Sequence, residues 1–275
     1  MTLPEASLGT LHRADGSATY SNAGYSVICA VNGPIEVQRR DEIPDEAAIE
    51  VNIRPSIGVG GPRERHLETL LHSTFRHIIL AHLHPRTLIQ ITLQILSLPE
   101  DESDLRSSAH IHLLPALLNT ASLALLHASI PLSTTLSSTT IAVPHSASDK
   151  PHSAPVLDPS PSQVRQAKSV HVFAFSSSGE ILLAESEGTF DVDEWEGVEV
   201  RAREACLGAG AEESPGAEEE EEGEGMEVDG EEDGGVSLGV DVGKASAAVE
   251  AKGLLGVVRK VVEDRVVEGE KWRGS

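Results

Sequence analysis

Apolar positions along the chain recur with two different periods. In residues 84–96, four isoleucine or leucine residues alternate with polar ones, and a period of two is typical of a strand with one buried face. In residues 113–129, leucines and alanines cover the whole helical circumference. A helix that is apolar all round is either buried on every side or spans a membrane. No Asp, Glu, Lys or Arg occurs between Ser107 and Ser148, so we expect this helix to lie at the centre of the core.

The remaining segments predict strands and helices around that centre. A helix is predicted to begin at Pro62, because a missing N–H costs nothing at the first helical position. The turn signal Asn32-Gly33-Pro34 predicts a hairpin in which residues 35–39 pair with residues 25–31. Further strands are predicted over 18–21, 48–54, 136–143, 169–175 and 180–185, and further helices over 193–206 and 254–266. This order of elements predicts an α+β fold.

Charge divides the chain into two parts. The net charge is −23 at pH 7, but 13 acidic residues and no Lys or Arg lie between Glu212 and Asp233. We therefore expect residues 207–243 to be disordered, since this Gly/Glu-rich segment has almost nothing to bury. Residues 1–168 carry 12 Lys or Arg and 16 Asp or Glu, a mild net charge of −4, so the acidity does not forbid an anionic partner for the folded part. The two cysteines, Cys29 and Cys206, give neither a disulfide framework nor a zinc spacing, which favours a reducing compartment.

No membrane association is expected. Residues 113–132 are about long enough to span a bilayer, but prolines and polar residues interrupt them and basic flanks are lacking. Residues 1–10 lack a basic region followed by an apolar run, so no secretory signal is expected. We expect a soluble protein.

Two features of the sequence are candidates for binding an anion or a metal ion. The glycine-rich turn 58–61, followed by Arg63 and Arg65, could present helix N–H groups to a phosphate. It matches neither the dinucleotide fingerprint nor the P-loop, so a plain turn before the helix is favoured. The His-x-His pairs at 82–84 and 110–112 have no carboxylate or cysteine at a matching spacing. No metal site and no cofactor is therefore predicted.

Scattered arginines in the first half of the chain are candidates for contact with nucleic acid. A phosphate backbone requires cations and not base readout. Solvated strand edges and helix ends are an equally good interpretation for any one of them. The arginines are Arg39, Arg40, Arg54, Arg63, Arg65 and Arg86. Taken alone, these patterns predict an α+β domain of unknown activity.

A series of motifs, taken in order, resembles those of RNase PH-like proteins. The resemblance covers about residues 11–190, and it rests on the order and spacing of the motifs rather than on any one of them. The motifs are RADGS at 13–17, VNGPIE at 31–36, IEVNIRP at 49–55, HPRT at 84–87, LLNTASLAL at 117–125, IP at 130–131, PVLDP at 155–159 and AESEG at 184–188.

Within that family, the chain is similar to the RNase PH-like subunits of the eukaryotic RNA exosome core ring. The resemblance implies the RNase PH fold, of the ribosomal protein S5 domain 2-like class, with two mixed β-sheets and α-helices packed on and between them. It implies an RNase PH-like domain over residues 1–206, the acidic insertion over 207–243, and a C-terminal helix over 244–275 that completes the domain.

Departures from the family pattern bear on activity. Active phosphorolytic members hold phosphate with a Gly-Gly-Thr-Arg motif just before the buried helix, whereas residues 108–115 of this chain read SAHIHLLP. Active members also carry an Asp that here corresponds to Ser169 or Val170. Phosphorolysis requires fixed donors for the anion and a protonated leaving oxygen. The resemblance therefore implies a subunit that is not an enzyme, with its vacated phosphate site filled by His110, Ile111 and His112.

The resemblance also implies a structural role and a set of partners. These are other RNase PH-like exosome subunits in a hetero-hexameric ring, S1/KH cap subunits, a hydrolytic exoribonuclease subunit and single-stranded RNA, in the nucleus, nucleolus and cytoplasm. The RNA backbone is predicted to contact Arg39, Arg40, Arg63 and Arg65 without base readout. Two alternatives stay open: an active phosphate-dependent 3′–5′ exoribonuclease, and an interaction protein that uses the acidic insert.

Overall fold

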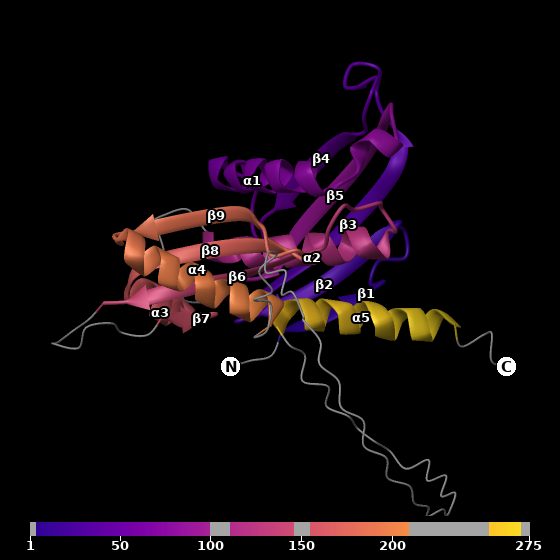
Figure 1. The fold of residues 1–275 in the computed structure, drawn as a ribbon. Helices are drawn as coiled ribbons and strands as arrows, with labels where there is room; N and C mark the ends of the chain where they lie inside the picture. Colours follow the sequence, from indigo (N-terminus) through magenta and orange to yellow (C-terminus); the bar gives the residue numbers. More distant parts are fainter. Residues whose placement is uncertain (1–3, 100–110, 146–154, 209–252, 271–275) are drawn as a thin grey trace, which may run out of the picture. The chain divides into compact units, whose positions relative to one another are not determined.

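The computed structural model describes residues 4–99, 111–145, 155–208 and 253–270. The first half of the chain forms a five-stranded sheet with the order β1-β2-β3-β5-β4 (Figure 1). Neighbouring strands are antiparallel except β4 and β5, which are parallel. The strands are β1 (Glu5–Leu8), β2 (Gly16–Asn22), β3 (Tyr25–Glu36), β4 (Ala48–Arg54) and β5 (Thr87–Ser97).

The helix α1 (Pro62–Ile78) joins the two parallel strands, and η1 (Ala81–Leu83) follows it before β5. Pro62 lies in the first turn, and the Gly61 N–H donates a hydrogen bond to Glu64 Oε2 at 2.6 Å. One face of the helix is buried through Leu67, Leu71 and Phe75, at the spacing that an amphipathic helix requires. The predicted helix start at Pro62 is confirmed.

The second sheet has the order β7-β6-β8-β9 and is antiparallel throughout, so only the first sheet is mixed. Its strands are β6 (Leu136–Pro144), β7 (Val156–Leu157), β8 (Ala167–Ser176) and β9 (Ile181–Gly188), with the short helix α3 (Pro161–Arg165) before β8. The strands predicted over 169–175 and 180–185 are confirmed as β8 and β9, which pair as an antiparallel hairpin.

The helix α2 (Leu114–His127), preceded by η3 (Ile111–Leu113), lies between the sheets (Figure 1). It contacts β2 and β3 of the first sheet and β6 and β8 of the second. Every residue from Leu114 to Leu125 is buried, which confirms the prediction of a central helix. The buried Asn119 carboxamide donates to the Ser138 carbonyl and accepts from the Ser138 N–H, both at 2.9 Å.

Two further helices pack on these layers. α4 (Val192–Leu207) covers the other face of the second sheet, where Val198 and Ala202 are buried against Phe173 and Phe175. α5 (Gly253–Glu270) contacts α4, α2 and β1. The helix predicted over 254–266 is thereby confirmed, whereas the predicted acidic segment lies outside the described residues except for Leu207 and Gly208. None of the described helices is long and apolar enough to cross a membrane.

The prediction of a hairpin between residues 25–31 and 35–39 is wrong. β3 continues through the turn signal to Glu36 and pairs with β5 on both sides of an irregularity between Asn32 and Ile35. The Gly33 N–H donates to Asp15 Oδ2 at 2.9 Å, and the Gly33 backbone packs against Leu88 and Ile89 of β5. These contacts with other parts of the chain keep the segment extended.

Candidate functional site

A small cavity lies in front of the N-terminus of α2. Its volume is about 20 Å³, which is enough for roughly one water molecule, since a water needs about 10–15 Å³. A phosphate ion, with four oxygens around its phosphorus, does not fit. The lining residues come from β2, the β2–β3 turn, β3, η3, α2, β6 and the segment after β7, and they are Tyr20, Asn22, Ala23, Tyr25, His112, Pro115, Ala116, Thr140, Asp158 and Pro159.

The start of α2 is poorly suited to hold an anion. Helix N-termini bind anions through their first, unpaired N–H groups. Here Pro115, which has no N–H, occupies the first turn, and Leu113 provides no side-chain cap. Leu114 and Ala116, on either side of Pro115, are buried among apolar side chains. The first turn of this helix therefore presents few donors to the cavity.

The electrostatics of the cavity also disfavour an anion. Asp158 has a positive φ of 46° and its carboxylate accepts a hydrogen bond from Thr139 Oγ1 at 3.3 Å. Burial raises the pKa of Asp158, while hydrogen bonds from Asn22 and Thr139 act in the opposite direction. Burial also raises the pKa of Tyr20, and the charge of Asp158 raises it further. Neither Lys nor Arg is among the described residues that line the cavity.

The residues predicted to fill the vacated phosphate site lie in different surroundings. Ile111 is buried in the main hydrophobic core. His112 lines the cavity, with its ring centroid 5.6 Å from that of Tyr25. His110 lies outside the described residues. The role assigned to the three residues stays a prediction.

The two positions matched to the family's Asp lie near the start of β8. Val170 belongs to the core cluster that surrounds α2. Ser169 is buried, and its Oγ lies 2.9 Å from His171 Nε2. Burial lowers the pKa of His171, with Glu194 acting in the opposite direction, and Ser186 Oγ lies 2.8 Å from its Nδ1. Neither matched position carries a carboxylic acid, and this buried hydroxyl–imidazole network was not anticipated from the sequence.

The four arginines predicted to contact RNA lie on two connections. Arg39 and Arg40 are in the turn after β3, and Arg40 Nε lies 3.3 Å from Asp41 Oδ1 in a largely exposed ion pair. Arg63 and Arg65 are exposed in the first turns of α1. The structure thus places the arginines in two pairs, one in the turn after β3 and the other at the start of α1.

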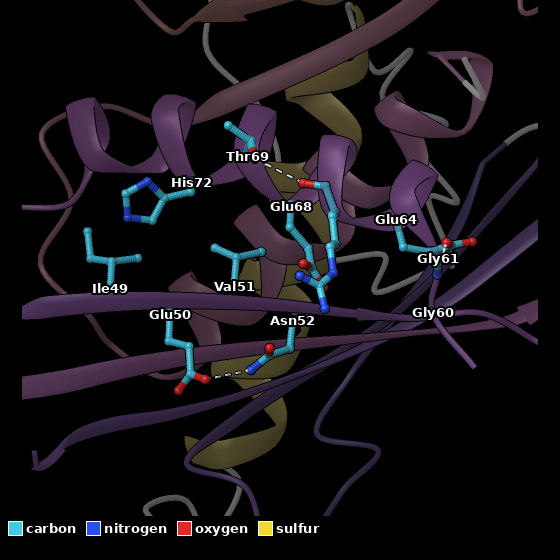
Figure 2. Close-up of a pocket in the computed structure, with 11 residues that line it drawn as sticks. Ile49, Glu50, Val51, Asn52, Gly60, Gly61, Glu64, Glu68, Thr69 and His72 are labelled. Atoms are coloured by element: carbon cyan, nitrogen blue, oxygen red, sulfur yellow. Dashed lines mark hydrogen bonds between the residues drawn. The ribbon is translucent and has the colours of Figure 1, made fainter. Parts of the chain in front are cut away.

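Arg65 also lines a second, wider cleft of about 630 Å³ between β4 and α1, shown in Figure 2. Glu50, Glu64 and Glu68 line the same cleft, and this acidic surrounding makes the cleft itself a poor site for a phosphate. No group of three His, Cys, Asp or Glu side chains that could hold a metal ion occurs in the described parts of the chain.

Comparison with known proteins identifies relatives over most of the chain. Residues 4–131 match the model of the 3′ exoribonuclease family, domain 1, named RNase_PH. The chain is 36% identical over 196 residues to the Saccharomyces cerevisiae protein "Exosome complex component RRP46", covering 69% of this chain and 84% of the relative. It is 36% identical over 122 residues to the Oryza sativa protein "Exosome complex exonuclease RRP46 homolog", covering 44% of this chain and 47% of that relative.

Solved structures agree with these relatives. The rice (Oryza sativa) Rrp46 crystal structure matches with a TM-score of 0.62 and 26% identity, over 72% of this chain and 86% of that one. The Archaeoglobus fulgidus exosome with RNA bound to the active site matches with a TM-score of 0.57 over 73% of this chain and 84% of that one, at 14% identity, which shows a shared fold alone. The chain belongs to the RNase PH family and has its fold.

Proposed function

We propose that this chain is a non-catalytic structural subunit of an RNA exosome core ring. Its relation to the Saccharomyces cerevisiae exosome component extends over 84% of that protein, which supports membership of the same kind of complex. The observation that carries the non-catalytic part is the cavity at the start of α2. Its volume of about 20 Å³ and the buried Asp158 in its wall both disfavour the binding of phosphate, which supports this part of the proposal.

Two physical requirements of phosphorolysis support the non-catalytic proposal. The attacking phosphate must be held by fixed hydrogen-bond donors or cations, and Pro115 removes one of the donors at the helix N-terminus. The leaving oxygen must be protonated by a group within hydrogen-bond reach. Neither Val170 nor Ser169, at the positions matched to the family's Asp, carries a carboxylic acid that could act as this proton donor.

The test is a phosphorolysis assay on the purified full chain. A 5′-labelled single-stranded RNA is incubated with the protein, inorganic phosphate and Mg²⁺, and release of nucleoside diphosphate is measured beside an active phosphorolytic exoribonuclease. We expect no release above that of a blank without protein. Phosphate-dependent shortening from the 3′ end would overturn the proposal. Thermal melts in phosphate and in chloride of equal ionic strength test whether the inactivity arises from a lack of phosphate binding. The two melting temperatures should then be equal.

The proposed role is to close a hetero-hexameric ring with other RNase PH-like subunits, under S1/KH cap subunits, and to pass single-stranded RNA to a hydrolytic exoribonuclease for processing of rRNA and turnover of other RNAs. Exposed arginines would track the RNA backbone. Arg40 stays available for this, since an exposed ion pair such as that with Asp41 contributes little. The proposed contacts are Arg39, Arg40, Arg63 and Arg65, and replacing them with glutamine in the assembled ring should weaken RNA binding and its salt dependence.

A second candidate function is exonuclease activity of the chain itself. The rice relative and an Arabidopsis thaliana relative both carry the name "Exosome complex exonuclease RRP46 homolog". Under that function the assay above would show RNA shortening, and omission of phosphate separates phosphorolysis from hydrolysis.

For location we propose the nucleus, nucleolus and cytoplasm, which imaging of a tagged chain in its own cells would test.

A further inference from the structure

The strand β4 forms one edge of the five-stranded sheet and pairs with β5 on one side only. On its other side, the Ile53 N–H donates to Glu68 Oε1 at 2.8 Å, so that N–H points away from β5. Alternate residues of a strand direct their backbone groups to the same side. Ile49 and Val51 therefore also present their N–H and C=O groups to the open edge.

Space for another strand already exists beside this edge. The cleft of about 630 Å³ is bounded by residues 49–52 of β4 and by one face of α1. Figure 2 shows Ile49 and Val51 on the helix side of the strand and Glu50 and Asn52 on the opposite side, with Glu68 and Thr69 of α1 above them. At about 30 Å³ per water in the liquid, the cleft has room for about 20 water molecules, which is enough for a short stretch of extended chain.

The charge of the cleft selects the kind of occupant. Its lining carries three carboxylates, Glu50, Glu64 and Glu68, against a single guanidinium, Arg65. Glu64 and Glu68 each use one oxygen within the chain, toward the Gly61 and Ile53 N–H groups. Excess negative charge repels the phosphates of RNA and attracts Lys and Arg. A basic polypeptide is therefore favoured over a nucleic acid.

The opposite edge of the same sheet is formed by β1, which is shorter than β4. β1 has four residues, Glu5–Leu8, whereas β4 has seven, Ala48–Arg54. Short strands, charged side chains and covered backbone groups are the usual protections of a sheet edge. Within the described parts of the chain, a side chain protects β4 in this way at Ile53, where Glu68 occupies the place of a partner strand. The edge at Ile49 and Val51 faces the open cleft.

We propose that the β4 edge and the α1 face bind an extended, basic segment of a partner protein, which adds a strand to the sheet next to β4. Backbone hydrogen bonds from Ile49 and Val51 would fix the register, as in other cases of strand addition. Lys or Arg side chains at alternate positions would contact Glu50 on one face of the sheet. The side chains of the intervening residues would pack against the face of α1 that carries Glu64 and Glu68. This inference does not rest on the role of the chain in an exosome ring.

The test uses a labelled probe peptide of about seven residues, a typical strand length, with Lys and Val alternating. Its binding to the full chain is measured by fluorescence anisotropy, beside the same peptide with N-methylated amides on alternate residues, a Glu/Val peptide and a short single-stranded RNA. We expect at least tenfold weaker binding after N-methylation and no measurable binding of the Glu/Val peptide. Equal binding of the N-methylated peptide would overturn the proposal, and so would binding of the Glu/Val peptide as tight as that of the Lys/Val peptide.

Two matched variants and one structural readout locate the probe. Glu50→Gln keeps the shape of the side chain and should weaken binding several-fold, whereas Glu180→Gln, at an exposed position in the turn before β9 of the other sheet, should leave it unchanged. Hydrogen exchange of the Ile49 and Val51 amides should slow when the peptide binds. Unchanged exchange at both amides, or equal effects of the two variants, would contradict a site at β4.

Discussion

Replacing Asn119 with alanine should destabilise the fold by several kcal/mol. Asn119 is buried in the central helix, and its carboxamide pairs with both backbone groups of Ser138 in β6 at 2.9 Å. β7 pairs with β6 only at Ile141 and Ala142, so at Ser138 the asparagine side chain takes the place of a neighbouring strand.

The magnitude follows from the groups left without a partner. Asn119→Ala leaves the Ser138 N–H and C=O buried and unpaired, and each such group costs about 1–3 kcal/mol. The expected loss is therefore about 2–6 kcal/mol, out of a total that is typically about 5–15 kcal/mol for a domain. At about 2–4 °C per kcal/mol for a chain of this size, the melting temperature should fall by about 4–24 °C.

Urea unfolding of the full chain, followed by circular dichroism, measures this loss. Asn52→Ala is the control, because Asn52 is half-buried on the β4 edge and, within the part of the chain that the structure describes, its side chain donates a hydrogen bond to the exposed Glu50. The control should change the free energy of unfolding by less than about 0.5 kcal/mol, as is usual at surface sites. An Asn119→Ala protein as stable as the control would refute the proposed anchoring.

Three further predictions concern packing, thiols and pH. Gly16→Ala should lower the free energy of unfolding by at least about 1–3 kcal/mol, because a Cβ at this position overlaps the Ala124 carbonyl. Gly197→Ala is the control and should not destabilise the fold, because a Cβ there meets open space. Equal melting temperatures of the two variants would contradict this packing. Burial raises the pKa of Cys206 to about 12 and also raises the pKa of Cys29. Neither thiol should therefore react with a disulfide reagent at about pH 8 until the chain unfolds. Rapid reaction of the native protein would be evidence against this burial. Burial lowers the pKa of His171, so on acidification the unfolded chain binds a proton at a higher pH than the folded chain does. The free energy of unfolding should therefore fall as the pH drops below about 6.5. Urea titrations at several pH values should show a smaller fall for His171→Asn.

The sequence was informative about the fold wherever burial alone determines the pattern. The alternation in β5 and the all-round apolar character of α2 both follow from how many sides of an element are covered. β1, which is four residues long, was not predicted, because its pairing with β2 leaves no periodic pattern in so short a segment. The course of β3 was mispredicted because Gly33 usually marks a turn, whereas here a contact with Asp15, 18 residues away, keeps the strand extended.

The candidate site was harder to predict than the fold. The resemblance directed attention to the start of α2, but the lining of the cavity also draws on Tyr20 and Asn22 of β2 and on Asp158. Asp158 is more than 130 positions from Tyr20 and Asn22 in the chain, and no local periodicity predicts that they lie close together in the fold. The only signal was that Asp158 belongs to one of the motifs shared with the family. The acidic cleft at β4 had no signal either, because an edge strand and a central strand can share one sequence pattern.

Purification of the chain from its own cells under mild conditions, followed by native mass spectrometry, tests the proposed role most directly. A structural ring subunit should be recovered at one copy per complex together with other RNase PH-like chains, S1/KH-type proteins and a hydrolytic nuclease. Recovery of the chain alone, or as a ring of identical copies, would contradict the account.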